Sequence, residues 1–163
     1  MNPSRTLHLF EADPSVVVVE SWSDPTLAQY GFAVTSDYVE VFWLTTLGPT
    51  ATWLLRRLAA ATSHCDPVHL DVAELATSLG IGSPVDRLTP LVKSLDRLVM
   101  FGVAQARRDR LAVRSHVPPL ASKQIDRLPP HLRRSHENWM AGRASIDFPI
   151  VTASKISVGR SAA

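Results

Sequence analysis

The stretch of residues 47–113 constrains the fold most, because it contains three segments with apolar side chains at helical spacing. The first covers residues 47–61, with Pro49 suited to a first helical position. The second covers residues 70–80 and starts with an aspartate cap, and the third covers residues 89–102 and starts with a threonine cap before a proline. Glycines end the second and third segments, so the sequence predicts a three-helix unit.

A basic segment with alternating side chains follows the third helix at residues 107–114. Its cationic side chains are Arg107, Arg108, Arg110 and Arg114. The pattern predicts a β-hairpin, and a twisted hairpin can bring several guanidinium groups against one phosphate backbone. A charged hairpin that faces only solvent is the alternative.

Residues 47–58, 72–80 and 89–103 resemble, in order, the three helices of bacterial winged helix-turn-helix DNA-binding domains, and residues 107–114 resemble their wing. The fold class that this resemblance implies is mainly α with a small β-hairpin wing, as a winged helix-turn-helix core with N- and C-terminal helical extensions. In such domains the third helix enters the major groove, and the wing contacts the DNA backbone or the adjacent minor groove.

Two shorter stretches resemble a small uncharacterised bacterial family, namely Tyr-Val-Glu-x-Phe-Trp-Leu from Tyr38 and Leu-Gly-Pro-Thr from Leu47. That likeness implies no particular activity. The winged-helix pattern has one departure, because residues 81–88 are longer than the tight turn that usually joins the two helices. This connection is either a short extra helical turn or a loop that carries Arg87 to a phosphate.

The remaining segments predict extensions around this core. Residues 15–20 contain four consecutive valines, which indicate a short strand that is buried on both faces or pairs with another strand. Residues 36–47 predict a helix with an aromatic side. We expect four parts, namely an N-terminal extension with a short strand (1–35), a winged-helix domain (36–120), a C-terminal helical extension (121–141) and a flexible tail (142–163).

The charge is unevenly distributed along the 163 residues, although the net charge is only +2. Residues 1–37 carry one arginine against five acidic residues, whereas residues 121–163 carry seven basic residues against three acidic ones. This asymmetry permits a phosphate-facing surface. It equally fits solvated charged faces, or an acidic N-terminal segment that docks on a basic body.

Other classes of protein find little support. No nucleophile elbow, P-loop or paired-carboxylate pattern is present, so we expect no enzyme and no cofactor. His64, Cys65 and His69 lack the spacing of a zinc site, so we expect a surface loop there and no metal. No apolar run approaches the roughly 20 residues of a membrane span, and the start lacks signal-peptide features, so we expect a cytoplasmic protein without a membrane partner.

The third helix places its leucines on one face and Val92, Lys93, Asp96 and Arg97 towards the other. Lys93 and Arg97 are suited to DNA, whereas Val92 offers only an apolar contact to a thymine methyl group. Asp96 would repel phosphate unless it is paired. The hairpin is therefore expected to be more convincingly basic than this helix.

We expect a DNA-binding protein, a transcriptional regulator that acts on double-stranded DNA as a homodimer, with the aromatic segment around Phe42 and Trp43 as the dimer surface. The alternative is a winged-helix protein-interaction or assembly module without DNA binding, which Asp96 and the long connection favour. The sequence identifies no small-molecule effector. The expected DNA-contacting residues are Arg87, Thr89, Lys93, Arg97, Arg107, Arg108, Arg110 and Arg114.

Overall fold

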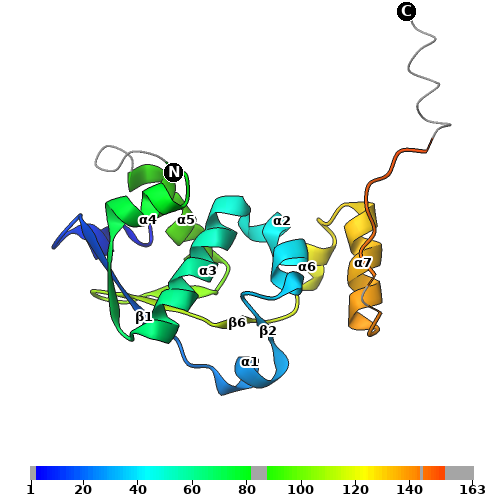
Figure 1. Ribbon diagram of the computed structural model, residues 1–163, viewed down its shortest axis with the longest axis horizontal. Helices are drawn as coiled ribbons and strands as arrows, with labels where there is room; N and C mark the ends of the chain where they lie inside the picture. The colour runs from blue at the N-terminus through cyan, green and yellow to red at the C-terminus, as the bar shows by residue number, and fades with distance from the viewer. Residues whose placement is uncertain (1–2, 82–87, 144, 153–163) are drawn as a thin grey trace, which may run out of the picture. The chain divides into compact units, whose positions relative to one another are not determined.

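The computed structural model describes residues 3–81, 88–143 and 145–152, and Figure 1 shows its ribbon. The chain divides into two compact units, residues 1–119 and residues 120–163. Helices predominate, and a small mixed sheet lies in the first unit. None of the helices within the described ranges combines the length and the apolarity that crossing a bilayer requires.

The larger sheet has four strands in the order β3-β1-β5-β4. Strand β1 (Val16–Ser21) is antiparallel to β3 (Val68–Asp71) and parallel to β5 (Leu111–Val113). Strand β4 (Ala104–Ala106) is antiparallel to β5, and the two form the predicted hairpin. The hairpin is therefore present, but it is one edge of a mixed sheet, so the β content exceeds that of a small wing alone.

Strand β1 lies inside this sheet because its valines suit burial on both faces. Val17 and Val19 are 1% and 0% exposed, and Val16 and Val18 on the other face are partly buried. The prediction that this segment is a strand paired with another strand is confirmed. A segment that the sequence placed in an N-terminal extension thus supplies an interior strand of the first unit.

Helix α3 (Pro49–His64) begins where the sequence predicted, because Gly48 separates it from the preceding α2 (Leu44–Leu47). Gly48 has a φ of 78°, a conformation that glycine adopts at little cost, and Pro49 then occupies the first helical position. The helix is longer at its C-terminal end than predicted.

Helix α4 (Val72–Ser78) is shorter than predicted, because the residues before it belong to β3. Its predicted cap is confirmed, since the Asp71 carboxylate accepts a hydrogen bond from the Glu74 amide at 2.7 Å. Helix α5 (Leu88–Met100) follows, and Gly102, with a φ of 72°, lies just beyond its end. The connection between α4 and α5, including Arg87, lies mostly outside the described residues.

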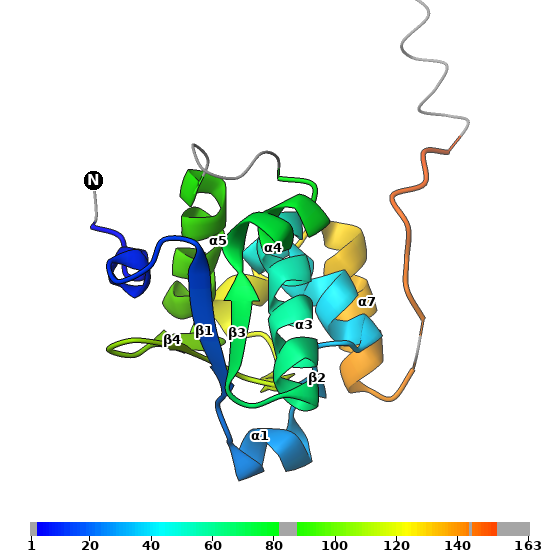
Figure 2. The ribbon, with the colours of Figure 1, turned by 60° about the vertical axis from the view of Figure 1, so that its left-hand side comes forward.

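The core of the first unit lies where α3 packs on α5 and on β1 (Figure 2). The leucines that line it, each at most 1% exposed, are Leu54, Leu55, Leu58, Leu91, Leu95 and Leu98. Val92 is also buried, so the expectation that it offers an open apolar contact is wrong. The leucines of α5 and Val92 together give this helix a wide buried stripe, which leaves a narrow exposed face.

The remaining elements of the first unit are short. They are the 3-10 helix η1 (Leu7–Phe10), α1 (Pro25–Tyr30), the π-helical turn η2 (Val39–Trp43), and a two-stranded sheet of β2 (Phe32–Ala33) and β6 (His116–Val117).

The aromatic segment around η2 is buried within the chain. Tyr38 stacks on Phe32 with ring centroids 3.7 Å apart, and the Trp43 indole N–H donates to the Pro118 carbonyl at 3.0 Å. Phe42 is fully buried and Trp43 nearly so. The expectation that Phe42 and Trp43 form a dimer surface is therefore wrong, because their apolar surface is already covered.

The second unit contains α6 (Ser122–Ile125) and α7 (Pro130–Met140). Beyond α7, Asp147 accepts from Arg134 at 3.0 Å, and its amide donates to the Ser135 hydroxyl at 2.7 Å. These bonds hold part of the predicted tail against α7. Residues 153–163 of that tail lie outside the described residues.

Replacing Val19 by Thr tests the burial of β1, because the side chains have the same shape and only the hydroxyl is new. Burying an unsatisfied hydroxyl costs about 1 to 3 kcal/mol, and we expect the free energy of unfolding in urea to fall by that amount. Val18→Thr is the matched control on the partly buried face, and its loss should stay below about 1 kcal/mol. Equal losses would contradict the assigned faces of β1.

Candidate nucleic-acid interface

The exposed face of α5 carries Lys93, Arg97 and Met100. The Arg97 guanidinium donates from Nε and Nη2 to the Thr46 carbonyl oxygen, at 3.0 and 2.7 Å. A carbonyl oxygen orients the guanidinium but carries no formal charge, so the positive charge of Arg97 is not compensated by this contact. The Lys93 side chain makes no hydrogen bond or ion pair within the described residues.

Asp96 on the same helix is occupied by the N-terminal segment. Its Oδ1 accepts from the Ser4 hydroxyl at 3.0 Å, from the amides of Arg5 and Thr6 at 2.8 and 2.9 Å, and from the Thr6 hydroxyl at 2.8 Å. Thr6 is fully buried. Asp96 is thus an anchor for the start of the chain, and its carboxylate is paired with donors, as the sequence required for it to tolerate a nearby phosphate.

This anchor brings Arg5 beside the cations of α5. Arg5 is exposed, and a cleft of about 230 Å³ is lined by Pro3, Arg5, Lys93, Asp96, Arg97 and Met100. Three cations and one carboxylate therefore share the cleft, and no ion pair joins them in the described part of the chain. The local charge is positive.

A second cleft, of about 220 Å³, lies on the other flank of Lys93 and Arg97. It is also lined by Pro49, Thr50 and Ala51 of the first turn of α3. The amides at a helix N-terminus lack intrahelical acceptors and carry partial positive charge, which adds to that of the two side chains.

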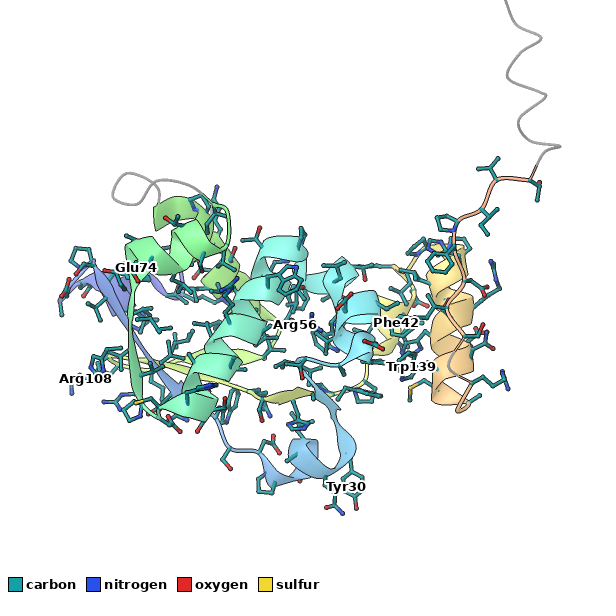
Figure 3. All side chains as sticks on the ribbon, in the orientation of Figure 1. Tyr30, Phe42, Arg56, Glu74, Arg108 and Trp139 are labelled. Atoms are coloured by element: carbon teal, nitrogen blue, oxygen red, sulfur yellow. The ribbon has the colours of Figure 1, made fainter. Side chains whose placement is uncertain are left out.

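The hairpin is less free than the sequence suggested, because acidic residues of the N-terminal part of the chain dock on it. Arg107 and Arg110 both pair with Glu20 of β1, and Arg110 also pairs with Asp109 at 3.1 Å. The hydrogen bond to Asp109, and in second place the hydrogen bond to Glu20, raise the pKa of Arg110. Arg108, at the far end of the hairpin in Figure 3, forms no ion pair within the described residues.

Arg114 has a structural role in this arrangement. It pairs with Asp24, donates from Nε to the Gly102 carbonyl at 3.0 Å, and lies 3.8 Å from the centre of the Trp22 ring. Only 16% of its side chain is exposed. The hydrogen bond from Arg114, followed by that from the Leu27 amide, lowers the pKa of Asp24. Arg114 is therefore largely used within the chain.

The N-terminal segment links α5 to the hairpin. At one end Ser4, Arg5 and Thr6 bind Asp96, and further along the His8 ring lies 2.8 Å from the Arg107 carbonyl oxygen. This segment brings Arg5 to the interface, a residue that the sequence did not indicate. No local motif marks Arg5, because its position depends on a bond to a residue 91 positions away.

Two expected contact residues are not placed by the structure. Arg87 lies outside the described residues, and Thr89 belongs to the first turn of α5, where its side chain is not described. Of the expected set, Lys93 and Arg97 lie together on α5. The hairpin arginines Arg107 and Arg110 lie together at Glu20, with Arg108 beyond them.

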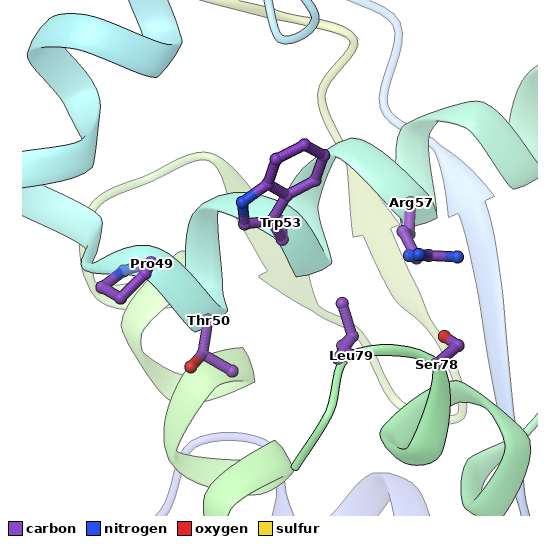
Figure 4. A pocket seen from close by; sticks show the side chains of 6 residues that line it. All are labelled: Pro49, Thr50, Trp53, Arg57, Ser78 and Leu79. Atoms are coloured by element: carbon purple, nitrogen blue, oxygen red, sulfur yellow. The ribbon is translucent and has the colours of Figure 1, made fainter.

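A separate cleft of about 340 Å³ lies between α3 and the end of α4 (Figure 4). It is lined by Pro49, Thr50, Trp53, Arg57, Ser78 and Leu79. The helical spacing of Trp53 with Leu54 and Leu58 predicts a place in the core for all three, but Trp53 is 53% exposed, so for Trp53 this prediction is wrong. The guanidinium of Arg56 lies 5.2 Å from the centre of its ring, which accounts for part of its stabilisation at the surface.

Comparisons with protein families, with curated proteins and with solved structures found no match. No group of three or more His, Cys, Asp or Glu side chains is placed to hold a metal within residues 3–81, 88–143 and 145–152.

The ion pair of Asp24 with Arg114 can be checked by titration. We expect the Asp24 pKa to lie below its usual range and to rise in Arg114→Ala, as measured by carboxyl chemical shifts against pH. Because the pKa is lowered in the folded state, the stability from this pair is present above the unfolded value of about 3.9 and is lost as the pH falls through the lowered value.

Asp13 is the internal control in the same spectra, because Ser15 lowers its pKa without any arginine. It should titrate identically in both proteins. An Asp24 pKa that is equally unchanged would show that Arg114 is not its partner.

Proposed function

We propose that residues 1–119 form a winged helix-turn-helix unit that binds double-stranded DNA, with α5 in the major groove and the β4–β5 hairpin along the backbone. On this proposal the protein is a transcriptional regulator. The observation that carries it is the row of Lys93 and Arg97 on the exposed face of α5, whose charges no carboxylate pairs with within the described residues.

The order of elements supports the proposal, because α3, α4, α5 and the hairpin follow one another as in winged-helix domains. The insertion of β1 between β3 and β5 distinguishes this chain from the simple pattern that the sequence suggested. Lysine and arginine side chains on a helix in the major groove can contact guanine or phosphate, and neutralised phosphates release counterions.

Binding to mixed-sequence duplex DNA at 50 and 200 mM salt, followed by fluorescence anisotropy, tests the proposal. We expect binding at 50 mM that weakens steeply at 200 mM, because counterion release drives it. Lys93→Ala should weaken binding about tenfold at 50 mM, since one phosphate contact contributes a slope of about 0.9 in log K against log salt.

Arg57→Ala is the matched control, because Arg57 is exposed on α3 and makes no ion pair in the described part of the chain. It should change the affinity far less than Lys93→Ala. Undetectable binding of the intact protein at 50 mM would exclude the proposal.

The second candidate is a protein-interaction or assembly module. It is favoured by the pairing of Arg107, Arg110 and Arg114 with carboxylates, and by the exposed Trp53 in its cleft. DNA binding at low salt that depends on Lys93 decides against it. A homodimer stays a prediction, and its surface would have to lie away from Phe42 and Trp43.

Replacing Glu20 by Gln tests whether the hairpin belongs to the DNA footprint. Glu20 neutralises Arg107 and Arg110, so removing its charge should strengthen DNA binding several-fold at 50 mM and steepen the salt dependence. Glu11→Gln is the control, because it removes the same charge from the N-terminal part of the chain but frees no arginine. Equal effects of the two changes would place the hairpin outside the footprint.

A further inference from the structure

We propose that Arg5 is a third DNA-contacting cation, that Asp96 is the residue which positions it, and that the cleft between Arg5, Lys93 and Arg97 binds a phosphodiester group of the DNA backbone. This inference rests on the proposed function. It adds to the proposed interface a residue from the start of the chain. It also changes the role of Asp96, which the sequence predicted to repel phosphate, to that of a residue that positions a cation.

The segment that carries Arg5 is held on both sides. Ser4, which precedes Arg5, donates its hydroxyl to Asp96, and Thr6, which follows Arg5, donates its amide and its hydroxyl to the same carboxylate. Thr6 is fully buried. Further along, Leu9 and Phe10 are buried. The backbone at Arg5 is therefore ordered before any ligand arrives, so binding a phosphate would restrict only the side chain and not the segment.

The cleft suits a phosphate group because one of its cationic side chains is held in place and the other two can change conformation. Arg97 is oriented by the Thr46 carbonyl, with Nη1 free of partners in the described residues, whereas Lys93 and Arg5 can adjust. A guanidinium fork and an ammonium group match phosphate oxygens, and Arg5 supplies a second fork. The volume of about 230 Å³ admits a phosphate group, and the exposed side chains leave room for its ester links.

A phosphate in this cleft could also come from a free anion rather than from DNA. A backbone phosphodiester is favoured because two of the three cations, Lys93 and Arg97, lie on the exposed face of the helix proposed to enter the major groove. Among the described residues that line the open cleft, none has a buried polar side-chain atom without a partner, the kind of group that would hold a small free anion tightly.

Replacing Asp96 provides a test, because two explanations of its role predict opposite changes in DNA affinity. If Asp96 only repels DNA, removing its charge strengthens binding. If Asp96 positions Arg5, Asp96→Ala releases the segment and weakens binding, even though a negative charge has been removed. In a chain that already lacks the Arg5 side chain, only the repulsion remains, so the same change should strengthen binding.

The experiment is a double-mutant cycle of Arg5→Ala, Asp96→Ala and the double variant in the full chain, with Arg57→Ala as control. Affinity for a mixed-sequence duplex is measured by anisotropy from 50 to 200 mM salt. Arg5→Ala should weaken binding about tenfold at 50 mM and reduce the salt slope by about one. Asp96→Ala should weaken binding in the intact chain and strengthen it in the Arg5→Ala chain.

The Arg5 side chain makes no bond in the described residues, so Arg5→Ala should fold normally. Thermal melting checks every variant. If Asp96→Ala does not fold, Thr6→Val, which removes one donor to Asp96, replaces it, and it should weaken binding in the same direction. Arg5→Ala that binds like Arg57→Ala would overturn the inference while leaving the proposed function intact, whereas an intact protein that does not bind DNA would overturn both.

A final arm separates the two sources of phosphate. Inorganic phosphate is titrated at constant ionic strength while the Nε–H resonances of the arginines are followed by NMR. We expect no saturable shift of Arg5 and Arg97 below about 10 mM phosphate, which is roughly the weak end of small-anion binding. Saturation below that concentration, lost in Arg5→Ala, would assign the cleft to a free anion instead of the DNA backbone.

Discussion

Strand β1 hydrogen-bonds to β3 on one side and to β5 on the other, and the arrangement of the strands and helices of the first unit depends on this double pairing. It joins a strand that precedes α4 to the hairpin that follows α5, so segments far apart in the chain share one sheet. Val17 and Val19 bury that sheet against the helices, where hydrophobic burial stabilises it. Because β1 carries Glu20 and follows η1, its position also brings the acidic and anchoring residues of the chain start to α5 and to the hairpin.

The distribution of free positive charge follows from the partners that each cation finds. The hairpin arginines meet the carboxylates of Glu20, Asp24 and Asp109, and each ion pair reduces the field that a phosphate would feel. On α5, Arg97 donates to the Thr46 carbonyl and lies 5.7 Å from the centre of the Phe101 ring, and neither partner cancels its charge. The helix that looked weakly basic in sequence thus carries the cations without carboxylate partners in the described part of the chain, and the hairpin that looked strongly basic is partly neutralised.

The N-terminal segment connects these two surfaces. Asp96 holds it on α5, and the contact of His8 with the Arg107 carbonyl holds it on the hairpin. If α5 faces DNA as proposed, a carboxylate on its exposed side would by itself oppose binding. In this chain four hydrogen bonds from Ser4, Arg5 and Thr6 to that carboxylate hold the N-terminal segment on α5 and place Arg5 beside Lys93 and Arg97.

The sequence by itself determined the elements whose signals are local. Apolar spacing, the Asp71 cap and Gly48 with Pro49 place α3, α4 and α5 near their observed ends, and the valine run identifies β1 as a paired strand, because each of these depends on neighbours within a few residues. Only the tertiary structure decided which strands β1 joins, that Trp53 stays exposed, and which charges remain free. The strand partners and the charge partners depend on contacts between residues far apart in the chain, such as Arg110 with Glu20 and Arg5 with Asp96 at about 90 positions, and no local pattern encodes such contacts.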